Sequence, residues 1–474
     1  MRYLLFPFLI AVSLGGASLA FPKPPIVSPA CPAPCDLRVA AEWEPVIGVL
    51  IGWPLQLPPS LVIALGHDVD LYVTVGNARN EERARKSFAA WGIDLSRVHF
   101  LHTTQGTGYY ITRDWGPFAV FDGQGNYRLV DSRYLDYPFS SARGKHLLWM
   151  PRSLGFNYRP DDQAPLAVAR HLCCPRIELP IALTGGNVFF DGQGTALSTQ
   201  LMLDENRAKG FSKQQFLDIV REGFGVHTFH FLPNFERLGI QHLDCLMKLL
   251  DEERILVKRP PADHALYKNI ETVVCHLSRL TNGYGRPYQI LRIDTPPYLL
   301  HKLANYTNSL IVNRKIYVPM FGIPADATAL QTWRDLMPGY EVLGFEHKGW
   351  SFADSLHCRV RGIWDPKMLY LTHRRPDAHA VWCSRFPLVL QARDYSGAGL
   401  IAEQLLLVWR PQGQARWNKV RLQPHGQAHH FVGHIEGTQP GQRVEYYFSA
   451  VSRSGKAETL PRTAPAGVYS FRLE

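Results

Sequence analysis

Two copies of one hairpin pattern restrict the fold more than any other feature of this sequence. The segments "GPFAVFDGQGNYRLVD" (116–131) and "GNVFFDGQGTALST" (186–199) each run from an apolar stretch through Asp-Gly into a second apolar stretch. Asp-Gly between apolar runs is a strong short-range hairpin signal. Weaker versions follow in "HLDCLMKLLDEERILVK", "NSLIVNRKIYVP" and "SLHCRVRGIWDPKMLYLTH". A unit repeated at roughly 50 to 70 residues predicts a radial or stacked repeat architecture, with an ordinary α/β sheet as the alternative.

The pattern of predicted helices and strands changes along the chain and suggests two domains. Between residues 40 and 378, strand-like runs alternate with helix-like stretches such as "EERARKSFAAWG", which is an α/β pattern. Residues 379–474 are rich in strands and poor in helices, as in a β-sandwich of immunoglobulin type. With 474 residues, 46% of them hydrophobic, the chain has enough apolar material for both domains.

The N-terminal region resembles an export signal followed by a linker. Residues 1–20 combine an early basic residue, a short apolar run and small residues before a cleavage point, whereas residues 21–39 are rich in proline. We therefore expect a cleaved signal peptide and a mature protein that is exported and soluble, with no integral membrane segment. An uncleaved N-terminal anchor is the alternative.

The charge and the cysteines exclude some functions. The formal charge is +10, but no run of five Lys or Arg occurs, so we expect an evenly spread basic surface and no nucleic-acid partner. The eight cysteines contain no CxxC pair, which argues against a zinc ribbon.

Polar residues stand at the first strand of the repeats, where an apolar residue would be expected. They are Asp114 in "TRDWGP", Asn187 in "TGGN", His242 and Asp244 in "QHLDC", Asn308 in "YTNS", and Cys358 in "SLHC". Strands that begin around a pseudo-symmetric axis would bring these residues into one central pocket.

The spacing within two of these motifs suggests which side chains act together. His242 and Asp244 are two positions apart, so on a strand they share one face; a satisfied structural His–Asp pair is the alternative. His357 and Cys358 are neighbours and in an extended chain face opposite ways. We therefore expect His242, and not His357, to exchange protons with Cys358, and only a modest effect of replacing His357.

This set of residues suggests chemistry at a guanidinium group. A cysteine nucleophile needs an electron-poor carbon and a proton carrier, and two carboxylates beside it match a planar cation. Cys358 would attack the guanidinium carbon, His242 would protonate the departing ammonia, and a water would then release a ureido product. A zinc site made by His242, Asp244 and Cys358 is an alternative.

Several motifs in fixed order resemble the guanidine-modifying superfamily, and within it the bacterial, porphyromonad-type peptidylarginine deiminases, which are related to agmatine deiminases. The motifs are "AEWEP", "TRDWGP", "TGGN", "QHLDC", "NYTNSLIVNRKIYVP", "MPGYEVLGF", "SLHCR" and "QRVEYYFSAVSRSGKAETLP". The resemblance implies a five-bladed α/β propeller followed by an immunoglobulin-like domain, and it implies no metal and no cofactor. It assigns the catalytic roles to Cys358, His242, Asp244, Asp114 and Asn308, and we expect Asp114, Asp244, Arg113 and Asn187 to contact the substrate.

The exported, two-domain layout favours the peptidylarginine branch, so the predicted partners are peptides or proteins that contain arginine. An agmatine or other small-guanidine deiminase is the nearest alternative, and an exported binding protein with an inactive domain is the second. The sequence departs from the family at Ile111, where an aromatic residue is expected, although Tyr109 and Tyr110 are adjacent. A pair of arginines that would grip a substrate carboxylate is also missing, and Arg133 or Arg143 would replace it only by rearrangement.

Overall fold

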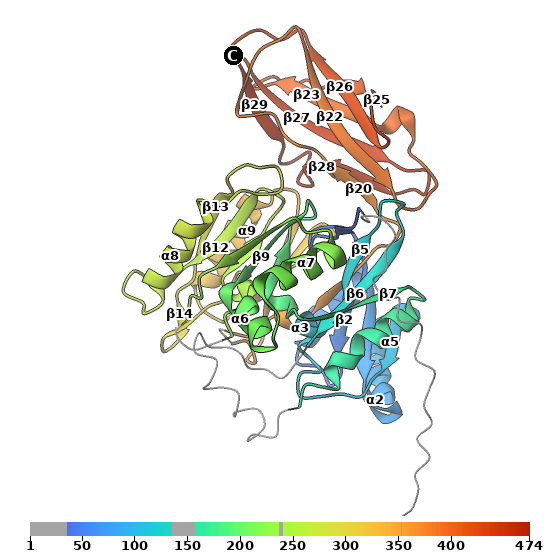
Figure 1. The fold of residues 1–474 in the computed structure, drawn as a ribbon, viewed down its shortest axis with the longest axis vertical. Coiled ribbons are helices and arrows are strands. Elements are labelled where there is room, and N and C mark those ends of the chain that lie inside the picture. Colours follow the sequence, from blue (N-terminus) through green and yellow to red (C-terminus); the bar gives the residue numbers. More distant parts are fainter. Residues whose placement is uncertain (1–35, 135–156, 237–239, 352) are drawn as a thin grey trace, which may run out of the picture.

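The computed structural model describes residues 36–134, 157–236, 240–351 and 353–474 (Figure 1). It confirms the α/β class for the first part of the chain. The predicted signal peptide (1–20) and most of the predicted linker lie outside the described residues. The last two linker residues form strand β1 (Arg38–Val39), which pairs with β5. No helix among the described residues is both long and apolar enough to cross a membrane.

Five sheets in the α/β part repeat one pattern, in which an antiparallel pair of strands is extended by a parallel strand. The sheets contain β19 (Arg361–Trp364), β2 (Val46–Gly52), β3 (Asp70–Val75) and β4 (Val98–His102); β1, β5 (Phe118–Phe121), β6 (Tyr127–Arg133) and β7 (Arg176–Ala182); β8 (Val188–Phe190), β9 (Thr195–Thr199) and β10 (Thr228–Leu232); β11 (Met247–Leu249), β12 (Arg254–Arg259) and β13 (Gln289–Asp294); and β16 (Leu310–Val312), β17 (Lys315–Met320) and β18 (Glu341–Glu346). A small sheet joins β14 (Pro297–Leu299) to β15 (Lys302–Leu303). The repeat is present, while the five-bladed propeller stays a prediction.

The helices of this part accompany the parallel strands and cover the sheets (Figure 1). They are α1 (Pro59–Asp68), α2 (Ala78–Ala90), α3 (Thr112–Trp115), α5 (Ala164–His171), α6 (Gln200–Ala208), α7 (Lys213–Phe224), α8 (Tyr267–Leu277) and α9 (Ala325–Leu336). Helix α7 shows how the local sequence sets such an element. Ser212 and Gln215 form a capping box at its start, and Gly225 ends it in the left-handed conformation.

The two predicted Asp-Gly hairpins are confirmed, and both turns are closed in the same way. In the turn between β8 and β9, the Asp191 carboxylate accepts hydrogen bonds from the backbone N–H groups of Gln193 (2.7 Å) and Thr195 (2.9 Å). Asp122 accepts from Gln124 (3.0 Å) and Asn126 (2.9 Å) in the turn between β5 and β6. The aspartate thus holds each turn through its own side chain, which explains the repeated "FDGQG".

The fifth predicted hairpin is wrong, although its strands exist. Strand β19 pairs with β2 near the start of the chain, whereas β20 (Leu369–Thr372) pairs with β22 (Arg385–Asp394) of the C-terminal part. A turn at residues 365–368 separates them, but the two strands belong to different sheets and do not pair with each other. The first strand of the C-terminal sheets therefore precedes the boundary that we placed at residue 379.

The C-terminal part is a separate body of strands, coloured orange to red in Figure 1. Its two sheets contain β20, β22, β26 (His430–Glu436) and β25 (Gln423–Pro424), and β21 (His379–Ala380), β29 (Tyr469–Leu473), β27 (Arg443–Val451), β23 (Leu406–Pro411) and β24 (Asn418–Arg421), with β28 (Ala457–Leu460) beside β27. Residues from both sheets, among them Leu390 and Phe448, share one apolar cluster. Strand richness is confirmed, and the immunoglobulin-like arrangement stays a prediction.

Candidate active site

Most of the predicted site residues lie in short helical turns that precede a strand, and none lies on a strand; His242 directly precedes such a turn, and Asn308 lies in a non-helical turn before β16. Asp114 lies in α3, whereas Asn187, Asp244 and Cys358 lie in single 3-10 turns at Gly185–Asn187, Leu243–Cys245 and His357–Arg359. His242 and Asp244 therefore do not lie on a strand, and His357 and Cys358 do not lie in an extended chain, so the side-chain directions predicted for them assumed the wrong local structure. The residues still converge, because the turns α3, Gly185–Asn187, Leu243–Cys245 and His357–Arg359 pack against one another.

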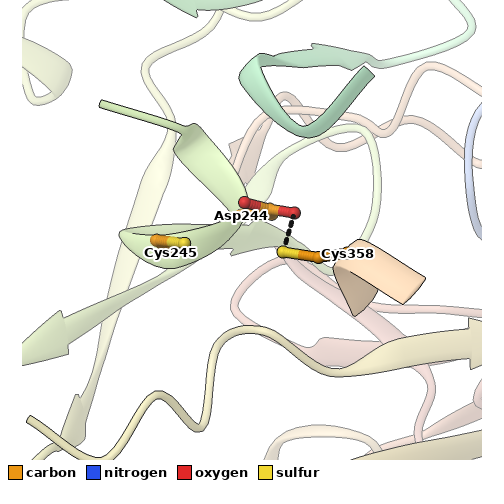
Figure 2. Close-up of side chains that lie close together, drawn as sticks. All are labelled: Asp244, Cys245 and Cys358. Atoms are coloured by element: carbon orange, nitrogen blue, oxygen red, sulfur yellow. Dashed lines mark hydrogen bonds between the residues drawn. The ribbon is translucent and has the colours of Figure 1, made fainter. Parts of the chain in front are cut away.

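Cys358 is held by groups from two other repeats. The Asn308 Nδ2–H group donates to its sulfur at 3.3 Å, and the thiol donates to Asp244 Oδ2 at 3.4 Å (Figure 2). Asn308 Oδ1 accepts from the backbone N–H of His357 (2.9 Å) and of Cys358 (3.4 Å). One amide side chain thus fixes the turn and contacts its sulfur, while a catalytic role of Asn308 stays a prediction.

The environment of Cys358 favours the neutral thiol. The adjacent Cys245 thiol lowers the pKa of Cys358, but burial and the nearby carboxylates of Asp244, Asp354 and Asp114 outweigh this effect and raise the pKa to about 11. At neutral pH the sulfur is therefore protonated until positive charge enters the site.

Asp114, His242 and Asp244 surround Gly186. The Gly186 N–H donates to Asp114 Oδ1 at 3.1 Å, and His242 Nδ1 lies 3.6 Å from the same oxygen. A Cβ atom on Gly186 would lie 2.7 Å from Asp114 Oδ1, 2.7 Å from His242 Nδ1 and 3.1 Å from Asp244 Oδ2. Burial lowers the pKa of His242 to about 4, against the opposing effect of Asp244, so the ring is neutral at pH 7 and can accept a proton.

Asp244 has one carboxylate oxygen with a full set of partners and one without. Oδ2 accepts from Cys358 and from His357 Nδ1 (2.9 Å), while Oδ1 is buried and has no hydrogen-bond partner among the described residues. Burial raises the pKa of Asp244, but the hydrogen bond and charge of His357 outweigh it, so the net pKa is lowered. A charged, buried oxygen without a donor is costly unless a ligand supplies one.

A buried charge network behind the site was missed by the sequence analysis. The Glu42 carboxylate contacts His357 Nε2 at 2.6 Å and Lys248 Nζ at 2.8 Å. Burial raises the pKa of Glu42, but His357, Lys248 and Arg113 together hold it well below its usual range. The "AEWEP" motif, quoted only for its resemblance, was the one signal that could have pointed to Glu42.

His357 bridges two carboxylates, one at each ring nitrogen. Burial and the Arg113 cation lower its pKa, and Glu42 and Asp244 oppose that shift. A neutral imidazole has one N–H and could donate to one of them only, whereas the doubly protonated ring donates to both. The net pKa of His357 is lowered, so at neutral pH the ring carries one N–H between its two carboxylate neighbours at 2.9 and 2.6 Å. The histidine next to the cysteine positions Asp244, a role that the sequence analysis did not assign.

The two other predicted substrate contacts lie against protein groups. The amide of Asn187 donates to Thr199 Oγ1 at 2.9 Å and accepts from the Thr199 backbone N–H at 3.3 Å, inside its own hairpin. The guanidinium of Arg113 lies 3.6 Å from Glu42 and donates to the carbonyl oxygen of His357 at 3.4 Å. Contact of either side chain with substrate stays a prediction, since both have structural partners.

The residues that depart from the family pattern lie at the edge of this region. Ile111 directly precedes α3. The rings of the adjacent Tyr109 and Tyr110 pack edge to face, with their centroids 5.4 Å apart. The Arg133 guanidinium lies 3.4 Å from Asp162. Arg143 lies outside the described residues.

Of the three zinc ligands predicted from the sequence, Asp244 and Cys358 belong to a cluster of possible metal ligands, but the third member of that cluster is Cys245 and not His242. Ligand atoms of Asp244, Cys245 and Cys358 all lie within 4.8 Å of one another (Figure 2). Cys245 takes the place that the sequence analysis gave to His242.

An α/β repeat fold that brings a cysteine, a histidine and two aspartates together defines the class of guanidine-modifying enzymes. The model of the family "Porphyromonas-type peptidyl-arginine deiminase" matches residues 38–359, and this chain belongs to that family. The match includes every predicted site residue and excludes the C-terminal sheets.

Individual relatives within the superfamily carry a different name. The agmatine deiminase of Stutzerimonas stutzeri is 26% identical over 342 residues, which cover 64% of this chain and 88% of that protein. Among solved structures, the agmatine deiminase of Enterococcus faecalis has a TM-score of 0.57 at 18% identity, and that of C. jejuni a TM-score of 0.55 at 16% identity. Each covers 69% of this chain and 96% of its own, and these likenesses show the fold.

Proposed function

We propose that this protein is a hydrolase that deiminates a small guanidine, with agmatine as the leading substrate. The observation that carries the proposal is the buried Asp244 Oδ1, which has no donor among the described residues although the carboxylate is charged. Asp114 adds a second carboxylate beside Gly186, next to which Asp244 also lies. A guanidinium is permanently charged and presents N–H groups in a planar fork, so it would satisfy both carboxylates at once.

The cation would also create the nucleophile. The pKa of Cys358 is raised to about 11 partly by surrounding negative charge, and a bound guanidinium would compensate that charge and lower it. The proton that leaves the thiol is taken by His242, whose lowered pKa keeps it neutral beforehand. Substrate binding and thiol activation are thereby coupled, so a free thiolate is not exposed in the empty site.

The reaction then proceeds in two halves. The Cys358 sulfur adds to the guanidinium carbon to give a tetrahedral adduct, His242 returns its proton to one nitrogen of that adduct, and the carbon–nitrogen bond breaks so that ammonia leaves and a covalent thiouronium remains on Cys358. In the second half, His242 takes a proton from water, the oxygen adds to the same carbon, and the carbon–sulfur bond breaks to give the ureido product. Asp114 and Asp244 hold the remaining nitrogens throughout, and Asn308 donates to the sulfur when it becomes negative.

The size of the substrate separates two candidates. The relatives named agmatine deiminase align over most of their own length, and this supports a small guanidine over the peptide substrate that the sequence analysis preferred. Peptidylarginine remains the second candidate because the matching family model carries that description.

The test is an assay of ammonia and ureido product from agmatine, free arginine, a peptide that ends in arginine and a protein with internal arginines. We expect turnover of agmatine and its loss in Cys358→Ala and His242→Ala. Turnover of only the peptide or protein substrates would transfer the assignment to peptidylarginine. No turnover of any of the four, with the wild type folded and reduced, would overturn the proposal.

A further inference from the structure

Cys245 is a buried thiol that the proposed reaction does not use. It follows Asp244 in the same 3-10 turn and is 1% exposed. Figure 2 shows its sulfur directed toward the sulfur of Cys358, with the Asp244 carboxylate beside them. The neighbouring Cys358 thiol and burial together raise the pKa of Cys245 well above its ordinary value.

The three side chains offer the donor set and the spacing of a tetrahedral metal site. Zinc–sulfur bonds of about 2.3 Å and zinc–oxygen bonds of about 2.0 Å place a sulfur and an oxygen roughly 3.5 Å apart in a tetrahedron. The distance from Cys358 Sγ to Asp244 Oδ2 is 3.4 Å, and all three ligand atoms lie within 4.8 Å of one another. Two thiols and a carboxylate favour a thiophilic ion over calcium or magnesium, which prefer oxygen alone.

Neighbouring side chains can hydrogen bond to the ligand atoms of such a site. The Asn308 Nδ2 atom lies 3.3 Å from the Cys358 sulfur and 3.9 Å from the Cys245 sulfur, so it can donate to both once they are thiolates. His357 donates to Asp244 Oδ2 at 2.9 Å and orients the carboxylate. Hydrogen bonds of this kind hold metal ligands in position in known sites.

We propose that Asp244, Cys245 and Cys358 form a binding site for Zn²⁺ that inhibits the enzyme by occupying its nucleophile. Binding replaces the two thiol protons, which leave to solvent, with two zinc–sulfur bonds and one zinc–oxygen bond, and no electron is transferred. A bound ion and a bound guanidinium would both require Asp244 and the Cys358 sulfur, so they exclude each other. The inhibitory half of this inference rests on the proposed deiminase function, whereas the binding half does not.

The binding half is tested with Co²⁺ as a spectroscopic substitute for zinc. Full-length protein, reduced and stripped of metal, is titrated with Co²⁺, and the thiolate-to-cobalt charge-transfer band in the near ultraviolet is recorded. We expect the band in the wild type, its displacement by Zn²⁺, and loss of roughly half of it in Cys245→Ser and in Cys358→Ala. Cys275→Ser is the matched control, because Cys275 is exposed on α8, and it should keep the full band.

The inhibitory half is tested by titrating Zn²⁺ against turnover of the accepted guanidine, with each variant compared to its own metal-free rate. We expect the inhibition constant for Zn²⁺ to rise at least about tenfold in Cys245→Ser and to stay unchanged in Cys275→Ser. The proposal is overturned if the wild type gives no thiolate band, or if the band or the inhibition is the same in Cys245→Ser as in the wild type. Since the band needs no turnover, it separates failure of the site from failure of the proposed function. Thermal unfolding of each variant confirms that it is folded.

Discussion

Replacing Gly186 by alanine tests the geometry of the site without removing any reacting group. Gly186 has no left-handed backbone, so alanine introduces no backbone strain, and the added Cβ would enter the space between Asp114, His242 and Asp244. At 2.7 Å from two of their polar atoms, it is closer than real Cβ contacts allow, so these side chains must move apart or lose contact with the substrate.

The expected loss follows from the contacts that the substitution removes. A hydrogen bond to a charged group contributes about 1.5–3 kcal/mol, so disrupting the guanidinium contacts of both carboxylates costs about 3–6 kcal/mol. That corresponds to a decrease in kcat/KM of about 10²- to 10⁴-fold.

The assay is steady-state deimination of the accepted guanidine, together with thermal unfolding to show that the variant is folded. Gly123→Ala is the matched control, because its Cβ would meet only Asp36 at an ordinary 3.5 Å in the β5–β6 turn. We expect its kcat/KM to remain within about twofold of the wild type. A folded Gly186→Ala enzyme with kcat/KM within about threefold of the wild type would refute the placement of the guanidinium between these residues.

Three further predictions concern titration and the charge network. Alkylation of Cys358 by iodoacetamide in the empty site should accelerate about tenfold per pH unit up to a pKa of about 11, as followed by mass spectrometry of its peptide; a plateau near neutrality would contradict the account. His357→Ala leaves Glu42 and Asp244 buried without their shared partner, so we now expect a loss of about 3–5 kcal/mol in urea unfolding and a clear fall in kcat, in place of a modest effect. A variant as stable and active as the wild type would restore the earlier expectation. Burial lowers the pKa of His373 from 6.5 to about 4, so between these values the unfolded chain binds a proton that the folded protein does not. Stability should therefore fall with decreasing pH across this window, by up to about 3 kcal/mol from this group, and calorimetry should find a weaker pH dependence in His373→Gln.

The repeated hairpins were readable in the sequence because each is closed locally. Asp122 and Asp191 bind the backbone of their own turns, so a short stretch of sequence specifies each hairpin. The fifth hairpin was predicted wrongly because its two strands pair with other strands and not with each other: β19 pairs with β2, and β20 pairs with β22. Apolar alternation predicts a strand but does not name the strand that it will pair with.

The site residues were predictable as a group, while their supporting contacts were not. Asp114, Asp244 and Cys358 stood out as polar residues in apolar surroundings at equivalent places in the repeats. Glu42 contacts His357, which is 315 positions away in the sequence, and a pattern of nearby residues cannot predict such a contact. The directions of the His357 and Cys358 side chains could not be predicted from strand alternation, because the chain forms a 3-10 turn there and not a strand.

The most direct test of the central claim is to trap the covalent intermediate on Cys358. Acid quenching during turnover of agmatine, followed by mass spectrometry of the peptide that contains Cys358, should reveal an adduct equal in mass to the substrate less ammonia. The adduct should be absent from Cys358→Ala, which should also release no ureido product. An unmodified Cys358 peptide in every quenched sample, together with continued turnover by Cys358→Ala, would contradict the account.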